Sequence, residues 1–326
     1  MSFASNVNKA LSEFDEISSS LAQSLSCFRA KVWASMAFCL VRYGARPIDY
    51  GRFEFYNKSS RRRNQYLTFI RYKRLYRRLM KEAYSHASIS ADKEQEYRIF
   101  SEFVHRPWIS VSRGGIDEVA LTDFVGRHGP VIAKPSRGEQ GKGVTQISDA
   151  ADLKAFLESI GDEVYVLEGK VYNCRELREL NPSSLNTLRV VTMIDNEGLI
   201  HVLGAWLRVG AIGKVVDNWG AGGVGYNVDI ETGMIDRAGR DKKNRSYIYH
   251  PGTDKCMVGF RIPNFKNVLE SVKKMAALTP YARYVGWDIA ITDDGIDLIE
   301  MNFPPGHDMM QSFENPVYDQ IRSMLK

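Results

Sequence analysis

The stretch from Val131 to Val144, Val-Ile-Ala-Lys-Pro-Ser-Arg-Gly-Glu-Gln-Gly-Lys-Gly-Val, combines lysines and glycines in the manner of a phosphate-binding loop. It nevertheless fits neither common pattern. A P-loop needs Ser or Thr after its Gly-Lys pair, and Gly143 follows Lys142 here. A dinucleotide-binding fingerprint needs a third glycine where Gln146 stands. The stretch therefore predicts either another kind of phosphate site or only a flexible turn.

Short β-branched runs on both sides place this loop at the top of a hairpin. Strands are expected at 131–134 and 144–147, with the loop at 135–143 between them. Glycines in such a loop let backbone N–H groups approach phosphate oxygens. Lys134, at the base of the loop on a rigid strand, would add a fixed positive charge.

A second polar motif lies near the end of the chain, on a predicted hairpin of two apolar strands at 287–292 and 296–301. Its turn is Asp-Asp-Gly at 293–295. Glu300 and Asn302 are two residues apart and therefore share one face of their strand, where Asp288 of the neighbouring strand can join them. Two carboxylates and an amide oxygen form a ligand set that suits Mg²⁺. The alternative is a solvent-facing carboxylate pair, which the apolar neighbours argue against, because buried acids need a partner.

Composition bounds the class of protein. The chain has 326 residues, is 44% hydrophobic and 25% charged, and has room for two or three domains. Its four cysteines form no C-x-x-C pair, which argues against a disulfide framework or a zinc site and favours a reducing compartment. The longest apolar run, 32–41, is about half of the ~20 residues that span a bilayer. A cytoplasmic protein is expected.

Positive charge is concentrated in one segment. Residues 55–81 contain ten basic residues and no acidic one, so the rest of the chain carries a net charge of −5 against +5 overall. Apolar residues at 69, 72, 76, 79 and 83 have helical spacing and predict an amphipathic helix with a basic outer face. Three interpretations stay open: a solvated helix packed on the protein, contact of residues 61–81 with an anionic membrane, and nucleic-acid binding. No nucleic-acid-binding signature supports the last.

The pattern of elements predicts an α+β protein in three parts. Residues 1–88 form a helical, basic N-terminal region, 89–170 a mixed part that includes the glycine loop, and 171–326 a part dominated by strands. Helices are expected at 89–103 and 153–160. Further strands are expected at 164–167, 190–194, 200–209 and 225–229, and a tight turn at 230–233.

Taken together, these motifs resemble the ATP-grasp superfamily: Lys134-Pro before a glycine loop, a strand ending in Leu167-Glu168, then Asp288, then Glu300-Met-Asn302. More narrowly, the chain is similar to ATP-grasp proteins associated with sugar transfer in polysaccharide biosynthesis. The segments that carry this narrower similarity are Asp92-Lys93, 184–192, 217–223 and 302–306. The similarity runs from about residue 89 to the end, and it implies an ATP-grasp fold in which two α+β lobes grip ATP.

The resemblance also implies roles for individual residues. The expected ATP contacts are Lys93, Lys134, Ser136, Gly138, Gly141, Gly143, Glu168 and Val171, with 168–171 as the hinge that reads adenine. Mg²⁺ or Mn²⁺ would be bound by Asp288, Glu300 and Asn302. Arg208 and Arg189 would neutralise charge on the transferred phosphoryl group, although each could instead be a structural ion-pair partner. Asn218, Gly306 and Gln311 would face the acceptor. The hinge departs from relatives in reading Glu168-Gly-Lys170, and Glu176 is the substitute considered for the ribose contact.

The activity implied by this resemblance is ADP-forming ligation of a carboxylate to an amine through an acyl phosphate. The expected substrate is a small molecule or a glycan-linked sugar acid, joined to an amino acid or amine at the inner face of the cytoplasmic membrane. Direct phosphorylation of a sugar or amino acid is the alternative. A non-catalytic, membrane-docked scaffold is a third interpretation, which the complete set of metal ligands argues against.

Overall fold

Two antiparallel sheets form the body of the protein in the computed structural model, which describes residues 3–83, 92–115, 117–138, 143–211, 213 and 222–326. The smaller sheet has the order β1-β4-β2-β3 and consists of β1 (Trp108–Val111), β2 (Val131–Pro135), β3 (Thr145–Ile147) and β4 (Tyr165–Gly169). The larger has the order β11-β10-β5-β6-β7-β8-β9. Its strands are β5 (Thr187–Ile194), β6 (Ile200–Val209), β7 (Val224–Val228), β8 (Gly239–Arg240), β9 (Ser246–Tyr247), β10 (Tyr284–Thr292) and β11 (Gly295–Asn302).

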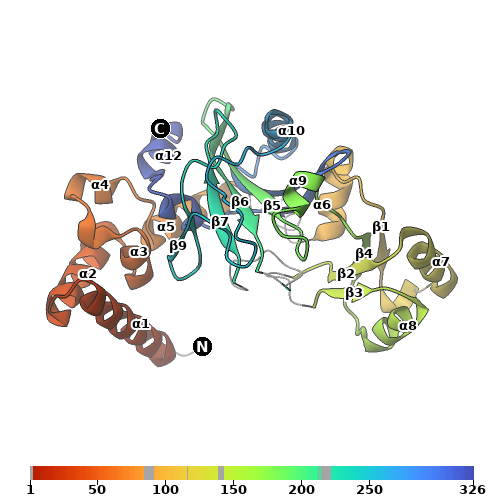
Figure 1. Ribbon diagram of the computed structural model, residues 1–326, viewed down its shortest axis with the longest axis horizontal. Helices are drawn as coiled ribbons and strands as arrows, with labels where there is room; N and C mark the ends of the chain where they lie inside the picture. The colour runs from red at the N-terminus through yellow and green to blue at the C-terminus, as the bar shows by residue number, and fades with distance from the viewer. Residues whose placement is uncertain (1–2, 84–91, 116, 139–142, 212, 214–221) are drawn as a thin grey trace.

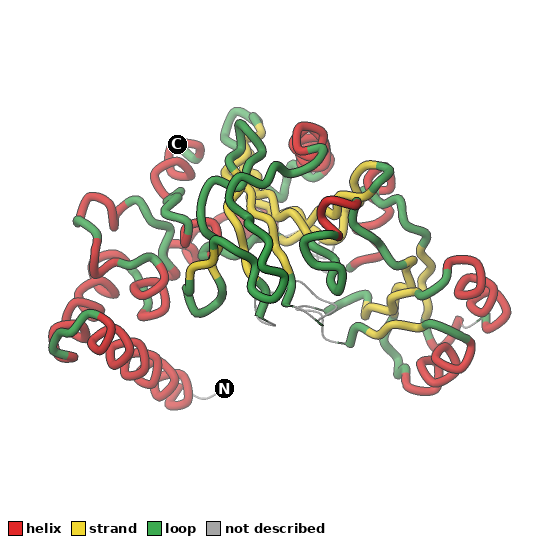
Figure 2. The backbone as a smooth tube through the Cα atoms, viewed as in Figure 1, coloured by secondary structure: helices red, strands yellow, loops and turns green. Residues whose placement is uncertain are grey.

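Helices lie at both ends of this body (Figures 1 and 2). The N-terminal region contains α1 (Phe3–Ser24), α2 (Arg29–Tyr43), α3 (Pro47–Arg52), α4 (Ser60–Asn64) and α5 (Phe69–Ala83). Around the small sheet are α6 (Lys93–Ile99), α7 (Glu118–His128) and α8 (Ala150–Ser159). The remaining helices are α9 (Arg175–Arg178), α10 (Phe265–Leu278), α11 (Met309–Ser312) and α12 (Tyr318–Met324). The predicted α+β class is thus confirmed.

The two faces of the large sheet are covered by different helices. Side chains alternate between faces along a strand, so Val190 and Trp287 point to one side and Val191 and Tyr284 to the other. The first side packs against α10 and also against residues of α6. The second packs against the apolar sides of α5, α11 and α12. As a result, the N-terminal region and the last helix share one hydrophobic core.

The predicted amphipathic helix matches α5 from residue 69 to residue 83. Its apolar side lies on the protein, because Leu79 is fully buried and Tyr72 and Leu75 pack against the core beneath α11 and α12. The interpretation of α5 as a helix packed on the body is therefore correct. Because this apolar side is covered, α5 can attract another molecule only through the positive charge of its basic side.

Most strands agree with the sequence analysis, and several helices were missed. The glycine loop does top the β2–β3 hairpin, and Asp149 caps α8 by accepting hydrogen bonds from the N–H groups of Ala151 and Asp152. The helix expected over 89–103 is shorter, since α6 ends at Ile99 and a separate turn follows at Ser101–Phe103. Strand β1 and helices α7 and α10 were not predicted.

We propose that the three parts end near residues 88 and 170, as the sequence suggests. The small sheet has its own core with α7 and α8, and the N-terminal helices α1–α3 have another. Packing nevertheless crosses these divisions. The buried Tyr97 and Phe100, at α6 and its end, belong to the core of the large sheet.

Candidate active site

A row of three charged residues crosses three neighbouring strands of the large sheet. Asp288 on β10 lies directly opposite Arg189 on β5 and directly opposite Glu300 on β11. Paired residues of neighbouring strands share a face, so all three side chains point to the side on which α5 and α12 pack. Two carboxylates in directly opposed positions repel each other, and the positive charge needed to hold them comes in part from Arg189.

An irregularity in β11 sets this arrangement. Asp288 pairs with Glu300 whereas Ile289 pairs with Leu298, so Ile299 is an extra residue in β11. Such a bulge redirects the side chains that follow it and is common beside active sites. Asn302 lies beyond the bulge opposite Gly286, and its amide nitrogen is 3.4 Å from a carboxylate oxygen of Asp288. The structure therefore brings together the three residues predicted to bind metal.

The carboxylate of Asp288 is bound by both arginines that the sequence analysis assigned to catalysis. Arg189 donates to it from Nε and from Nη2, the latter at 2.7 Å, and Arg208 donates from Nη1 at 2.8 Å. Burial raises the pKa of Asp288, but the charges of Arg189 and Arg208 outweigh burial and lower it to about 2. In this structure the arginines are ion-pair partners, which was the alternative left open for them.

Glu300 is the carboxylate of this row best suited to bind a cation. Burial and the neighbouring charge of Asp288 raise the pKa of Glu300, while Arg189 and the lysines Lys93 and Lys134 lower it. No residue in the described ranges donates a hydrogen bond to its carboxylate, and within those ranges no group of three or more His, Cys, Asp or Glu side chains forms a metal cluster. Two opposed carboxylates with the Asn302 amide fit one divalent cation, because it would remove their repulsion.

The N-terminus of α6 is fastened to the glycine hairpin. Asp92 caps α6 and also accepts a hydrogen bond of 2.8 Å from the Ser136 hydroxyl. The Lys93 backbone N–H donates to the Ser136 carbonyl at 3.1 Å, and Lys93 Nζ donates to the Gly138 carbonyl at 3.1 Å. Ser136 is buried and its own N–H donates to Val164. Its hydrogen-bonding groups thus hold the hairpin in place.

Two other residues of the hairpin, Gly143 and Lys134, have defined structural reasons for their positions. Gly143 has a φ of +72°, and a Cβ there would lie 2.9 Å from Pro135 Cγ, so this position requires glycine. Gly141 lies outside the described residues. Lys134 stands on β2 as predicted, and its Nζ forms an ion pair with Glu168 on β4.

Glu168 belongs to a buried ionic network. Its carboxylate accepts hydrogen bonds from Arg106 Nε at 2.8 Å and from the Tyr97 hydroxyl at 2.6 Å, in addition to the Lys134 ion pair. Arg106 also pairs with Asp297 of β11, which links the two sheets. Burial raises the pKa of Glu168, but the positive charges of Arg106 and Lys134 outweigh burial and lower it to about 2.

A cavity of about 230 Å³ opens between the two sheets beside this network. Its lining includes Lys134, Glu168 and Val171, which were predicted to contact ATP, together with Ile299 of the large sheet. The exposed Glu176 does not line it, although Arg178 on the same helix does. The apolar Ile132, Val144 and Leu185 complete a site that suits a flat ring with charged groups at one end.

The loop after β11 lies over the charged row. A Cβ added to Gly286 would lie 2.9 Å from Pro305 and 3.1 Å from Arg189, which places the loop directly above the candidate metal ligands. Gly306 is exposed on this loop. Gln311 is buried, however, and its amide oxygen accepts from the Leu67 N–H at 2.7 Å. Its amide nitrogen donates to the carbonyls of Leu67 and His307.

We therefore propose that Gln311 positions the loop and does not itself face the acceptor. The third residue predicted to face the acceptor, Asn218, lies outside the described residues.

The N-terminal region holds the same loop from the other side. Asp49 is 1% exposed, and its Oδ1 is 3.1 Å from His307 Nε2. Arg52 forms an ion pair with Asp308. The His307 ring stacks on Tyr72 of α5, with ring centroids 4.7 Å apart. Nothing in the sequence connects positions 49, 72 and 307, so sequence reasoning missed this contact.

Two further residues near the site were missed. Glu96 on α6 is buried, and it accepts a hydrogen bond of 2.5 Å from the N–H of Met301, between the predicted ligands Glu300 and Asn302. Burial and the charge of Glu300 raise the pKa of Glu96 to about 8. Arg106 is the other missed residue. The signal for it was Asp297, an acid within an apolar strand that needed a buried cation as its partner.

A two-sheet α+β body with a hairpin over a cavity and an Asp–Glu–Asn set beyond it defines an ATP-grasp protein. The chain belongs to the family described as sugar-transfer associated ATP-grasp, whose model matches residues 71–317. The match begins within α5, earlier than the residue 89 expected from the motifs, and so includes part of the N-terminal region.

Several solved structures are similar in fold. One is an ADP complex of purK, N5-carboxyaminoimidazole ribonucleotide synthetase, with 12% identity over 68% of this chain and 46% of that chain and a TM-score of 0.45. Another is the VanG D-Ala:D-Ser ligase from Enterococcus faecalis, with 13% identity, coverage of 72% and 62%, and a TM-score of 0.46. A third is the D-alanine–D-alanine ligase from Bacillus anthracis, with 16% identity, coverage of 73% and 64%, and a TM-score of 0.41. This chain thus spans less than two thirds of each.

No curated protein matches the sequence. In the part of the chain that the structure describes, no helix has the length and apolar character needed to cross a membrane.

Proposed function

We propose that this protein is an ATP-dependent, ADP-forming carboxylate–amine ligase. The observation that supports this most directly is the closeness of a carboxylate of the large sheet to two lysines from other elements. Glu300, on the large sheet, lies close enough to Lys93 and Lys134, from α6 and the small sheet, for their charges to affect its pKa. Carboxylates that suit a cation and lysines that suit phosphates are thus near enough to act on one another, which supports a role in phosphoryl transfer.

In the proposed reaction, an oxygen of the substrate carboxylate attacks the γ-phosphorus of ATP, and ADP leaves with the electrons of the broken P–O bond. The amine nitrogen then attacks the carbonyl carbon of the acyl phosphate, phosphate leaves, and the amine loses a proton. Lys93, Lys134 and the backbone of the hairpin would bind the phosphates. The cavity lined by Glu168 and Val171 would bind adenine.

Asp288, Glu300 and Asn302 would bind Mg²⁺ or Mn²⁺, which supplies charge neutralisation of the phosphates when present. Arg189 and Arg208 already lie on Asp288, so they stand beside the position where negative charge develops. A cation bound to Asp288 would neutralise part of its negative charge, so Asp288 would hold Arg189 and Arg208 less strongly. Both arginines would therefore be available to the transferred phosphoryl group.

The acceptor would bind under the loop 303–311, with Asn218 and Gly306 nearest to it. We propose a sugar acid or a glycan precursor of polysaccharide biosynthesis as the carboxylate, and an amino acid or simple amine as its partner. The family description, which names sugar transfer, supports this substrate class. Ligation at the cytoplasmic face of a membrane is consistent with precursors of that kind.

The test is ADP release, measured across amino acids paired with uronic acids or sugar nucleotides. A ligase releases ADP stoichiometrically with phosphate, and only when a carboxylate and an amine are both present. ADP release with one substrate and no free phosphate would identify a phosphotransferase instead. A scaffold would release no ADP with any pair.

We also propose weak, electrostatic contact of residues 61–81 with anionic membranes, since the apolar side of α5 is occupied by the core. The exposed cations Arg61, Lys73 and Lys81 would supply it, at ~1 kcal/mol each near an anionic surface. Sedimentation with anionic vesicles at low salt should disappear at high salt, because the Debye length shrinks from ~10 Å at 0.1 M to ~3 Å at 1 M. Absence of sedimentation at low salt would rule the contact out.

A further inference from the structure

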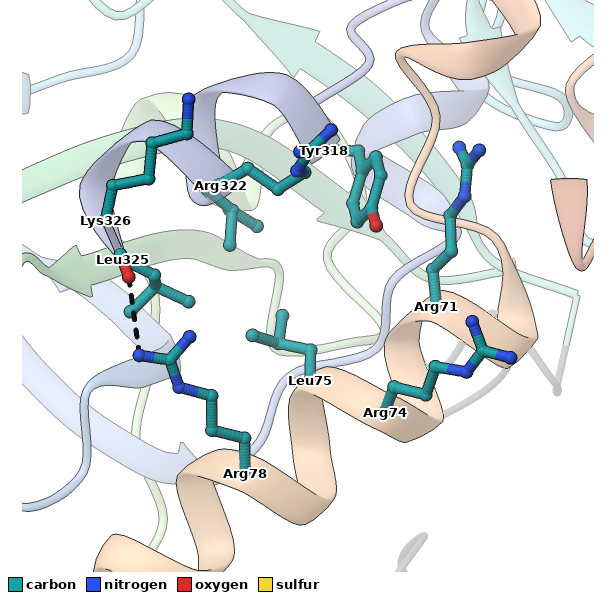
Figure 3. Close-up of a pocket in the computed structure, with 9 residues that line it drawn as sticks. Arg71, Arg74, Leu75, Arg78, Tyr318, Arg322, Leu325 and Lys326 are labelled. Carbon is teal, nitrogen blue, oxygen red and sulfur yellow. Dashed lines mark hydrogen bonds between the residues drawn. The ribbon is translucent and has the colours of Figure 1, made fainter.

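A second cavity, distinct from the nucleotide cleft, lies between α5 and α12 and has a volume of about 310 Å³ (Figure 3). Among the described residues, its lining contains five basic side chains and no acidic one: Arg71, Arg74 and Arg78 from α5, and Arg322 and Lys326 from the end of the chain. Like charges brought together repel, so such a cluster costs stability unless an anion occupies it.

The walls of this cavity are held in place by the protein. Arg71 donates hydrogen bonds of 2.8 Å to the carbonyls of Asn64 and Tyr66, and it stacks on the Tyr318 ring with 4.4 Å from Cζ to the centroid. Arg322 lies over the same ring at 5.6 Å. The Tyr318 N–H in turn donates to the Gln65 carbonyl at 2.9 Å. Arg71 and Arg322 are therefore positioned before any ligand arrives.

Three of these cations lack an acidic partner among the residues that the structure describes. Within the described residues, no carboxylate lies within ion-pair distance of Arg74, Arg322 or Lys326. Asp319 on α12 acts on Arg71 only at longer range and does not line the cavity. Arg78 donates to the Leu325 carbonyl at 3.3 Å.

The floor of the cavity is apolar. Leu75 of α5 faces Ile321 and Leu325 of the last helix and its end (Figure 3 labels Leu75 and Leu325). A site with several fixed guanidinium groups around an apolar floor suits a compact, multiply charged phosphate group attached to an apolar or neutral body. Guanidinium groups bind phosphate oxygens through paired N–H donors, and several of them together suit a group with several charged oxygens.

We propose that the cavity between α5 and α12 binds a phosphate-bearing anion, such as a diphosphate or a phosphate monoester headgroup. This site is separate from the charged row of the large sheet and does not depend on the proposed ligation. Occupancy would link the N-terminal region to the last helix through the arginines of both.

The probes are inorganic pyrophosphate and a short-chain, water-soluble phosphatidic acid, measured by titration calorimetry on the full chain. Arg77 provides a matched control, since it lies on the same helix, is exposed, and does not line the cavity. The double variant Arg74→Gln, Arg322→Gln should weaken binding at least ~10-fold, while Arg77→Gln should change it less than ~2-fold. Without ligand, no variant should melt below the wild type, because each substitution removes a positive charge and none creates a cavity in the core.

The two probes distinguish the source of the phosphate. Tighter binding of phosphatidic acid indicates a lipid headgroup whose acyl chains use the apolar floor, and equal or weaker binding indicates a soluble phosphate compound. The proposal is wrong if neither probe binds below ~1 mM. It is also wrong if Arg77→Gln weakens binding as much as the double variant, because the effect would then come from overall charge.

Discussion

His307 stacks on Tyr72 with 4.7 Å between ring centroids, and this contact joins the N-terminal region to the loop above the candidate active site. Asp49 fixes the other side of the imidazole through Nε2 at 3.1 Å. The same loop carries Pro305, which lies against Gly286. The position of the loop therefore determines how much space is left above Asp288 and Glu300. The helical region is thus part of the proposed acceptor site.

The first prediction concerns this contact. His307→Ala should lower kcat/KM for the acceptor by ~10-fold or more through loss of positioning, while KM for ATP stays within ~2-fold. His201→Ala is the matched control, since His201 of β6 also contacts an aspartate: its Nε2 is 2.7 Å from Asp195 Oδ2. An equal loss for ATP and acceptor would show that the contact only supports the fold.

The second prediction concerns the metal site. Glu300→Gln keeps the side-chain shape and removes one charge from the cation ligands, so ATP-dependent turnover should fall at least ~100-fold. The melting temperature should not fall, because the variant also relieves repulsion with Asp288. Asp294→Asn, an exposed carboxylate in the turn of the same hairpin, is the control. Unchanged turnover in Glu300→Gln would remove Glu300 from the site.

The third prediction concerns the nucleotide. Lys134→Ala should weaken ATP binding by ~1.5–3 kcal/mol, the range for a charge-assisted hydrogen bond, and should affect AMP much less. Lys154→Ala is a suitable control, because Lys154 is exposed on α8 and is not among the residues that line the cavity. Equal losses for ATP and AMP would mean that Lys134 serves chiefly as the ion-pair partner of Glu168.

The fourth prediction concerns stability. Glu168→Gln leaves the buried Arg106 without one of its two carboxylates, so the free energy of unfolding at pH 7 should fall by about 3–5 kcal/mol. Glu179→Gln, which removes one charge from the exposed pair with Arg175, should have no measurable effect.

The same variant has a defined pH dependence. The pKa of Glu168 is lowered in the folded state, so its contribution is complete above the unfolded pKa near 4.5 and is lost as the pH falls toward about 2. The difference in unfolding free energy between wild type and Glu168→Gln should therefore shrink between pH 4.5 and pH 2 in urea titrations. A difference that is constant with pH would contradict the ion-pair explanation.

The parts of the site that lie on regular strands could be predicted from sequence. The two-residue spacing of Glu300 and Asn302 and the turn at 293–295 place the ligands on one hairpin, and the structure shows Asp288 opposite Glu300. The apolar periodicity of α5 likewise predicts its buried side. In both cases a local pattern, with period 2 or 3.6, carries the information.

Contacts between distant segments could not be predicted, because no local pattern records them. Arg106 precedes β1 in an irregular segment, and its two carboxylate partners are 62 and 191 residues away. Gln311 and Leu67 are 244 residues apart and form a pair of hydrogen bonds. Helix α10, in contrast, could have been predicted from a local pattern. Its buried residues Phe265, Val268, Val272 and Met275 have helical spacing.

The extra residue at Ile299 has a consequence for the tolerance of the chain to insertion and deletion. Removing that single residue would restore regular pairing along the hairpin, and a strand without the bulge is the less strained one. Glu300 would stay opposite Asp288 and on the same face, because Leu298 would still pair with Ile289 and side chains alternate along a strand. The deletion would therefore keep every proposed metal ligand in place and would instead remove Ile299 from the lining of the cavity between the sheets.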